Sequence, residues 1–136
     1  MSGTQHIQPP EVFSSQDIGF TQVVASPPGT LLFLSGQVAW DRDRKLIGEG
    51  DLGKQVEQAL KNLGHTLAAA GATPSDVTMI RCYVAGYKPE HAAVLSSRLG
   101  DFFSGSPPPA STWIGVETLA APDLLIEIET MAVIAS

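Results

Sequence analysis

The sequence predicts an α+β protein in which two helices cover one face of a mixed, mainly β sheet. Two segments carry apolar residues at helical spacing, and strand-like segments flank both of them. The chain has 136 residues, which is the size of one domain with one core. We therefore expect residues 1–136 to form a single domain, with the element order strand, strand, helix, strand, helix, strand, strand.

Two strands are predicted near the start of the chain. Residues 1–12 are expected to form a loose arm. Residues 21–25 and the apolar residues 31–35 have the composition of strands, and the Pro-Pro-Gly sequence within 26–30 predicts a turn that makes them a hairpin. Gly36 follows directly, at a point where the backbone bends or another group approaches closely.

The first helix is predicted to begin after Asp51, a good N-cap residue, and to end at Gly71. Its core-facing residues recur every three or four positions: Leu52, Val56, Leu60, Leu63 and Leu67. The second helix is predicted from Pro89, which suits a first helical turn, to the breaking residues Gly105 and Pro107. Its predicted core residues are Val94 or Leu95, Leu99, Phe102 and Phe103.

Three further strands are predicted, at residues 77–85, 110–116 and 124–134. The faces predicted for the first are Ile80, Cys82 and Val84 against Val77, Met79 and Tyr83. In the last strand, the residues expected to pack under the helices are Leu124, Ile126, Ile128, Ala132 and Ile134. The opposite face is too apolar for a solvated surface and too charged for a core, which is typical of a subunit interface or a ligand cleft.

Composition argues against several classes of function. The formal charge is −6 and no basic stripe is visible, which disfavours nucleic acid as a partner. No apolar run approaches the roughly 20 residues of a membrane span, and residues 1–10 lack a signal-peptide pattern, so we expect a cytoplasmic protein without a membrane partner. The histidines have no metal-site spacing, and the single cysteine, Cys82, is expected to be buried and inert.

Four short segments, spaced between Gly19 and Ile134, form a recognisable set. They read Gly-Phe-Thr-Gln at 19–22, Leu-Ser-Gly-Gln at 34–37, Pro-Ala at 109–110 and Ile-Glu-Ile-Glu at 126–129. In order and spacing they resemble the GYSQ, SGQ, PAR and IEIE motifs of the Rid family (reactive intermediate deaminase, also called YjgF). Each motif is weak alone, and their combination makes the resemblance specific.

The resemblance implies a chorismate-mutase-like fold assembled as a homotrimer, with small-molecule clefts between subunits. It also implies hydrolysis of enamines and imines, such as 2-aminoacrylate, to a 2-keto acid and ammonia, without a metal or cofactor. In the family an arginine after Pro-Ala grips the substrate carboxylate, since a guanidinium donates two parallel hydrogen bonds. A glutamate of the IEIE segment positions the attacking water.

This sequence keeps part of that residue set. Glu127 corresponds to the water-positioning glutamate, and Gly36 to the position where the backbone approaches the substrate. Phe20 stands at the position of an active-site tyrosine and lacks its hydroxyl. Ser111 stands where the arginine belongs, so the chain resembles an arginine-lacking subfamily. We therefore expect little activity on 2-aminoacrylate.

Several roles stay open on the sequence alone. Ser111 either binds the ligand or satisfies backbone groups at a strand start. Trp113, predicted on the same strand face, either lines the cleft or anchors a subunit contact, and Trp40 either closes the cleft or anchors a surface loop. Arg81 either replaces the missing arginine or pairs between subunits with a glutamate of the last strand. Arg98, on the second helix, is expected to be solvated.

Three functions are compatible with these residues. The first is hydrolysis of an imine or enamine on a substrate that lacks the family's carboxylate anchor. The second is binding of a small molecule, or a moonlighting role, without turnover. The third, an endoribonuclease activity attributed to some relatives, is disfavoured by the acidic charge. The residues predicted to meet in one cavity at a subunit boundary are Phe20, Gly36, Ser111, Trp113 and Glu127, with Glu127 as the catalytic group and the others as binding groups. Arg81 is the further candidate binding residue, as the alternative anchor.

Overall fold

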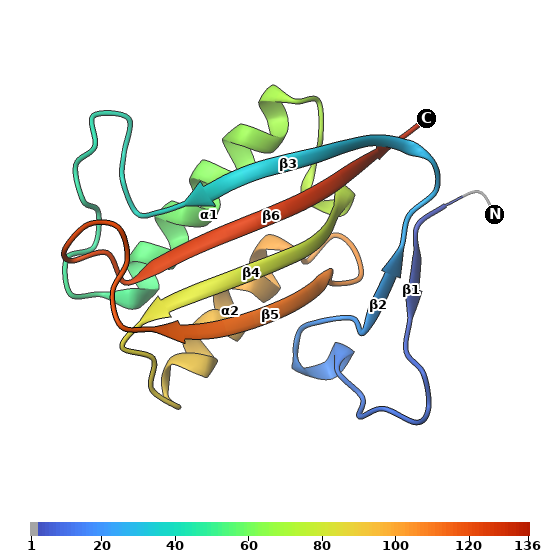
Figure 1. Ribbon diagram of the computed structural model, residues 1–136, viewed down its shortest axis with the longest axis horizontal. Coiled ribbons are helices and arrows are strands. Elements are labelled where there is room, and N and C mark those ends of the chain that lie inside the picture. The colour runs from blue at the N-terminus through green and yellow to red at the C-terminus, as the bar shows by residue number, and fades with distance from the viewer. Residues whose placement is uncertain (1–2) are drawn as a thin grey trace.

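In the computed structural model, which describes residues 3–136, a four-stranded mixed sheet is covered on one face by two helices (Figure 1). The sheet order is β3-β6-β4-β5. Its strands are β3 (Gly29–Gln37), β4 (Val77–Ala85), β5 (Ala110–Val116) and β6 (Ile126–Ala135). Strand β6 is antiparallel to both neighbours, whereas β4 and β5 are parallel. The predicted fold class is confirmed.

The helices connect the strands and form the second layer. Helix α1 (Leu52–Ala69) links β3 to β4, and α2 (His91–Phe102) is the crossover between the parallel strands β4 and β5. As predicted, the Asp51 side chain caps α1 by accepting a hydrogen bond from the Lys54 amide at 3.0 Å. Gly71 follows α1 with a φ of 79°, the left-handed conformation expected of it.

The N-terminal strands form a separate two-stranded sheet, so the predicted hairpin of residues 21–35 is wrong. Strand β2 (Val23–Ala25) pairs with β1 (Gln5–Ile7) and not with β3, and residues 5–7 are therefore a strand and not part of a loose arm. The reason is an anchor at Thr21, whose amide donates to the Pro109 carbonyl at 3.0 Å. That contact holds this segment at the β5 edge of the sheet, opposite the β3 edge (Figure 1).

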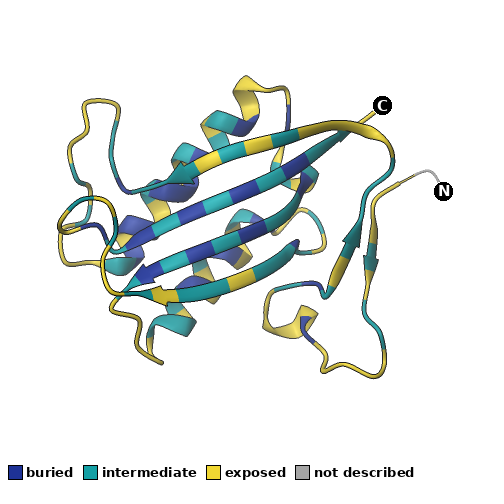
Figure 2. Ribbon diagram, viewed as in Figure 1, coloured by how far each residue is buried: buried dark blue, intermediate teal, exposed yellow. Residues whose placement is uncertain are grey.

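The core lies between the sheet and the helices, and along β4 and β6 buried residues alternate with less buried ones (Figure 2). In β6 the inward residues Ile126, Ile128 and Ala132 are fully buried. Val77, predicted on the opposite face of β4, is also buried, because a register shift between Val77 and Met79 turns it inward. Burial raises the pKa of the Cys82 thiol to about 12, which makes it an inert core residue.

One buried amide fixes the entry into β6. Gln55 of α1 is fully buried, and its side chain donates to the carbonyls of Gly48 at 3.1 Å and Asp123 at 2.9 Å. Its oxygen accepts from the Leu125 amide at 2.8 Å, so both ends of the amide are satisfied. This clamp holds the chain two residues before Glu127.

Within residues 3–136, no helix has the length and apolar composition needed to cross a membrane.

Candidate functional site

Glu127 lies on the open face of the sheet, opposite the helices, beside a bulge in β3. The pairing of β3 with β6 is regular up to Leu34 and then shifts, so that Gln37 pairs with Ile128. The shift brings Gly36 against the Glu127 side chain: a Cβ atom on Gly36 would lie 2.7 Å from both Cγ and Cδ of Glu127. The absence of a side chain at Gly36 is what leaves room for this carboxylate.

The second glutamate of β6 is engaged in the structure. Glu129 accepts hydrogen bonds from the Arg81 guanidinium at 3.2 Å and from the Tyr83 hydroxyl at 3.0 Å. Arg81 thus pairs with a glutamate of the last strand, as expected, but within one chain. The Glu127 carboxylate, in contrast, makes no hydrogen bond or ion pair with any side chain or backbone group of residues 3–136. Of the two carboxylates, Glu127 is the one with neither oxygen engaged by the described residues.

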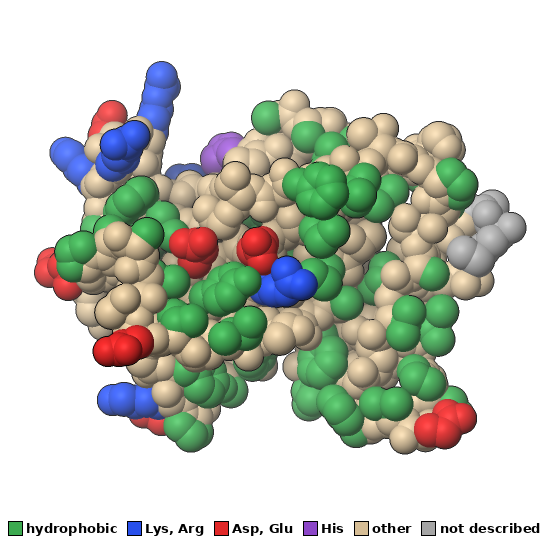
Figure 3. Space-filling view, viewed as in Figure 1, with side chains coloured by type: hydrophobic (Ala, Val, Ile, Leu, Met, Phe, Trp, Pro, Cys, Tyr) green, Lys and Arg blue, Asp and Glu red, His purple; other side chains and the backbone are tan. Residues whose placement is uncertain are grey.

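The open face surrounding these charges is hydrophobic. Figure 3 shows acidic and basic side chains in contact near its centre, among many hydrophobic side chains. Phe33 is 74% exposed and Leu31 is 48% exposed, and they pair across the strands with Met131 and Val133. A patch of this kind on a protein surface marks a binding or association site.

The contact with Glu129 changes the titration of Tyr83. The hydrogen bond to the Glu129 carboxylate, followed by desolvation, raises the Tyr83 pKa above its usual value of about 10. Since the neutral phenol is favoured by folding, its contribution to stability is present below pH about 10 and is lost as the pH rises through the higher folded-state pKa. In a Tyr87→Phe variant Tyr83 is the one tyrosine left, so a pH titration of phenolate absorbance reports Tyr83 alone. The absorbance is expected to appear at a higher pH than for a free tyrosine, and Glu129→Gln is expected to lower the Tyr83 pKa. A Tyr83 pKa unchanged by Glu129→Gln would contradict this assignment.

A cavity of about 430 Å³ lies at the β5 edge of the sheet, on the side of the helices. Ser111 pairs with Ile80 and Trp113 with Cys82, both core residues, so Ser111 and Trp113 face α2, as their predicted common strand face requires. The residues lining the cavity are Ile18, Phe20, Ala92, Ser96, Ser111 and Trp113. It contains no charged side chain.

The segment before β2 brings Phe20 to this cavity. The Ser15 hydroxyl, which is fully buried, donates to the Phe20 carbonyl at 2.7 Å and closes a short loop. The next residue, Thr21, is anchored to Pro109 immediately before β5. Phe20 is therefore held over the start of β5, close to Ser111.

The structure divides the predicted site residues into two groups. Gly36 and Glu127 meet on the open face of the sheet, where Arg81 also lies. Phe20, Ser111 and Trp113 meet at the cavity on the helical face. Within one chain the sheet separates the two groups, so the convergence of all these residues at a subunit boundary stays a prediction.

Two cavity residues on α2 were missed by the sequence analysis. Ala92 and Ser96 are four positions apart, so they lie on one face of α2. The property that these two residues share in the sequence is small size. Because small residues are common on helix surfaces, this property does not identify them as cavity residues. Ile18, the third missed residue, belongs to the short 3₁₀ turn Gln16–Ile18 and is 51% exposed.

Trp40 lies at a different hollow, of about 800 Å³, between residues 38–47 and α1. Asn62 of α1 builds this hollow by donating hydrogen bonds to the carbonyls of Val38 at 3.0 Å and Trp40 at 2.8 Å. Gly36 lines the same hollow, so Trp40 neighbours the Gly36 group and not the cavity beside Ser111. Its role in closing a cleft stays a prediction.

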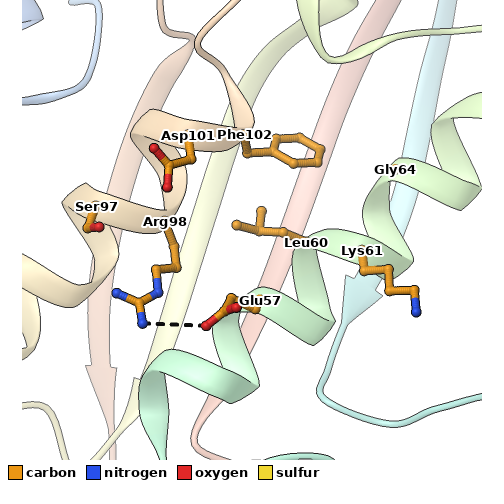
Figure 4. A pocket seen from close by; sticks show the side chains of 8 residues that line it. All are labelled: Glu57, Leu60, Lys61, Gly64, Ser97, Arg98, Asp101 and Phe102. Carbon is orange, nitrogen blue, oxygen red and sulfur yellow. Dashed lines mark hydrogen bonds and ion pairs between the residues drawn. The ribbon is translucent and has the colours of Figure 1, made fainter.

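Arg98 lies in a third hollow, a groove of about 550 Å³ between α1 and α2 (Figure 4). Its guanidinium forms a 3.4 Å ion pair with Glu57 across the two helices, and both side chains are partly exposed. This groove is on the helical side of the sheet, whereas Glu127 is on the open side. Arg98 therefore does not reach Glu127 within the chain.

Among residues 3–136, no three His, Cys, Asp or Glu side chains are grouped to hold a metal ion.

The sequence and fold match a known family and its solved structures. Residues 15–134 match a family model described as endoribonuclease L-PSP. The chain is 32% identical over 115 residues to Protein DfrA of Myxococcus xanthus, which covers 84% of each protein.

Two crystal structures illustrate the structural match. YyfB from Yersinia pestis, described as a protein of unknown function of the conserved Rid family, is 40% identical with a TM-score of 0.94, over 97% of this chain and 99% of that one. RidA from an Antarctic Psychrobacter is 26% identical with a TM-score of 0.69, over 84% of this chain and 87% of that one.

Proposed function

We propose that this chain, which belongs to the Rid/YjgF family, hydrolyses an imine or enamine without a metal or cofactor. The proposed reaction takes place in clefts between the subunits of a homotrimer. The observation that carries the proposal is the state of Glu127. Its carboxylate sits in the space left by Gly36 and is not engaged by any other side chain of residues 3–136, whereas Glu129 is held by Arg81 and Tyr83. A carboxylate so placed is able to orient water or take its proton.

Assembly is supported by the two faces of the sheet. A monomer leaves the apolar open face, including Phe33 and Leu31, in water. It also leaves Glu127 on one side of the sheet and the Ser111 cavity on the other. In our proposal, association of subunits buries the open face and brings Glu127 of one subunit to the cavity of its neighbour.

We therefore expect a trimer in solution, with three times the monomer mass by light scattering at micromolar concentration. A Phe33→Asp variant is expected to shift the mass toward the monomer, because it puts a charge in the apolar face that association would bury. Ala93→Asp, at an exposed position of α2 on the helical side of the sheet, is the matched control and is expected to remain trimeric. A monodisperse wild-type monomer would contradict both the assembly and the composite cleft.

The proposed chemistry needs one water molecule and no other reactant. Water oriented by Glu127 attacks the carbon of the C=N bond while the nitrogen takes up a proton, which gives a carbinolamine. Its C–N bond then breaks, ammonia leaves, and the hydroxyl proton is lost as the carbonyl product forms. Glu127 accepts the proton of the attacking water and passes it to the nitrogen, and in the second step it carries the hydroxyl proton to the departing nitrogen, so that it ends unchanged.

The proposed substrate lacks a carboxylate. A serine hydroxyl at position 111 supplies neither the charge nor the paired donors of a guanidinium. Arg81, the alternative anchor, is already paired with Glu129 at 3.2 Å. A carboxylate placed near Glu127 would meet a like charge and lose its hydration without compensation.

The test compares two imines generated in place by oxidases. We expect ammonia release to be accelerated for the imine of an amine without a carboxylate, such as benzylamine, and little affected for the imino acid of a simple amino acid. Without a carboxylate anchor, the imino-acid rate is expected to be roughly 30- to several-thousand-fold below that of an arginine-containing Rid protein. Turnover of imino acids at the rate of such a protein would overturn the substrate class and favour Arg81 as the anchor.

Two other functions give different outcomes. A small-molecule-binding protein that uses the same cleft would bind a neutral ligand and accelerate neither reaction. The endoribonuclease activity named in the family description is disfavoured by the −6 charge and by the acidic groups on the open face. A cytoplasmic location stays part of the proposal.

A further inference from the structure

The cavity beside Ser111 has the chemistry of a site for an uncharged group. Its six lining residues supply two aromatic rings, two aliphatic side chains and two serine hydroxyls, with no ionisable side chain among them. The start of α2 does not substitute for a cation, since the His91 amide donates to the Lys88 carbonyl at 2.9 Å and the Ala92 amide to the Pro89 carbonyl at 3.2 Å. An anionic group placed here would lose its hydration with no compensating charge.

The Ser111 hydroxyl is the buried polar group beside this cavity that has no hydrogen-bond partner. Its oxygen is buried and makes no hydrogen bond within residues 3–136. Buried hydroxyls in folded proteins are nearly always hydrogen-bonded, so an unpartnered one beside a cavity needs an explanation. A ligand that brings a neutral acceptor to Ser111 supplies that hydrogen bond.

We propose that this cavity is the subsite for an uncharged aromatic ring of the ligand, whose adjoining imine or carbonyl group accepts a hydrogen bond from Ser111. Phe20 and Trp113 offer ring surfaces to the aromatic group, and the volume of about 430 Å³ suits a small molecule of this size. The inference rests on the proposed function, because the acceptor is the group that Glu127 is proposed to hydrolyse.

The depth of the subsite is set by two small residues of α2. Ala92 is half-buried and Ser96 is exposed, and neither belongs to the core cluster. A leucine in place of Ala92 would fill the cavity with little disturbance of the helix, because leucine is a good helix former. Ala93→Leu is the matched control, since Ala93 is exposed and does not line the cavity.

The test measures binding without turnover, with acetophenone as the probe and benzoate as its charged counterpart of similar shape. The chain has two tryptophans, so a nitrogen-edited NMR spectrum carries two indole N–H signals, and Trp40→Phe assigns the signal of Trp113. Acetophenone is expected to shift the Trp113 signal saturably, and benzoate is not. Ala92→Leu is expected to weaken acetophenone binding by about 10-fold or more, whereas Ala93→Leu leaves it unchanged.

The outcomes separate this inference from the proposed function. Equal or tighter binding of benzoate, or an Ala92→Leu variant that binds acetophenone as the wild type does, would overturn the subsite even if neutral imines are hydrolysed. Saturable acetophenone binding that Ala92→Leu removes would support the subsite even if no imine is hydrolysed, and the hydrolase proposal alone would then fail. A Trp113 signal that acetophenone does not move would also overturn the subsite.

Discussion

Replacement of Glu127 by glutamine is expected to lower the rate of neutral-imine hydrolysis by roughly 10²- to 10⁴-fold, the usual contribution of a general base. Glutamine keeps the size and shape of the side chain in the space left by Gly36, so the fold and the trimer are expected to persist. The loss should fall on kcat more than on KM, because the carboxylate acts on water and not on the apolar part of the substrate. Steady-state kinetics with ammonia detection measures both constants.

The matched control for this variant is Glu129→Gln. Glu129 lies two residues along the same face of β6, and its replacement removes the negative charge that faces Arg81 and Tyr83 while leaving Glu127 intact. Its kcat is expected to stay near the wild-type value. Equal losses in the two variants would show that the negative charge of the face matters and that Glu127 has no specific role.

Gly36→Ala tests the position of the same carboxylate without removing it. The added methyl group would overlap the Glu127 side chain, whose Cγ and Cδ lie 2.7 Å from the position of the new Cβ. Displacement of a catalytic group by about 1 Å typically lowers a rate on the order of 100-fold. If Gly36→Ala retains the wild-type kcat, the position that Glu127 occupies beside Gly36 is not the one from which it acts on water.

Introduction of an arginine at position 111 is expected to raise activity on imino acids by roughly 30- to several-thousand-fold. The guanidinium would supply the charge and the paired donors that a substrate carboxylate needs. No Asp or Glu lines the cavity beside Ser111, so no carboxylate of the cavity would capture the guanidinium before the substrate binds. The measurement is kcat/KM for the imino acid of a simple amino acid, with and without the substitution.

The control for the arginine variant is Ser111→Met, which adds an unbranched chain without charge. It is expected to give no gain on imino acids, and both variants are expected to lose activity on neutral imines because they fill part of the cavity. A Ser111→Arg variant with no gain, in a protein that remains trimeric, would show that the missing arginine does not account for the substrate class.

The local features of the fold followed from the sequence because their causes are local. The structure contains the predicted cap at Asp51 and the helical stripe from Leu52 to Leu67. It also contains the two strands with the predicted bounds, 77–85 and 110–116, and the common face of Ser111 and Trp113. Side-chain periodicity and capping depend on residues a few positions apart, which the sequence lists directly. The family motifs assigned both Gly36 and Glu127 to the predicted site, without predicting their direct contact.

The features that the sequence did not decide depend on contacts between distant segments. The pairing of β2 with β1 results from the anchoring of Thr21 at Pro109. The position of Glu127 beside Gly36 results from a register shift between β3 and β6. The cavity that joins Ser111 to Ala92 is formed where β5 meets α2. Which residues carry charge, rings and hydroxyls can be listed from the sequence. Which of them meet depends on strand register and helix packing, because these are set by the shape of the whole core and not by the neighbours of each residue.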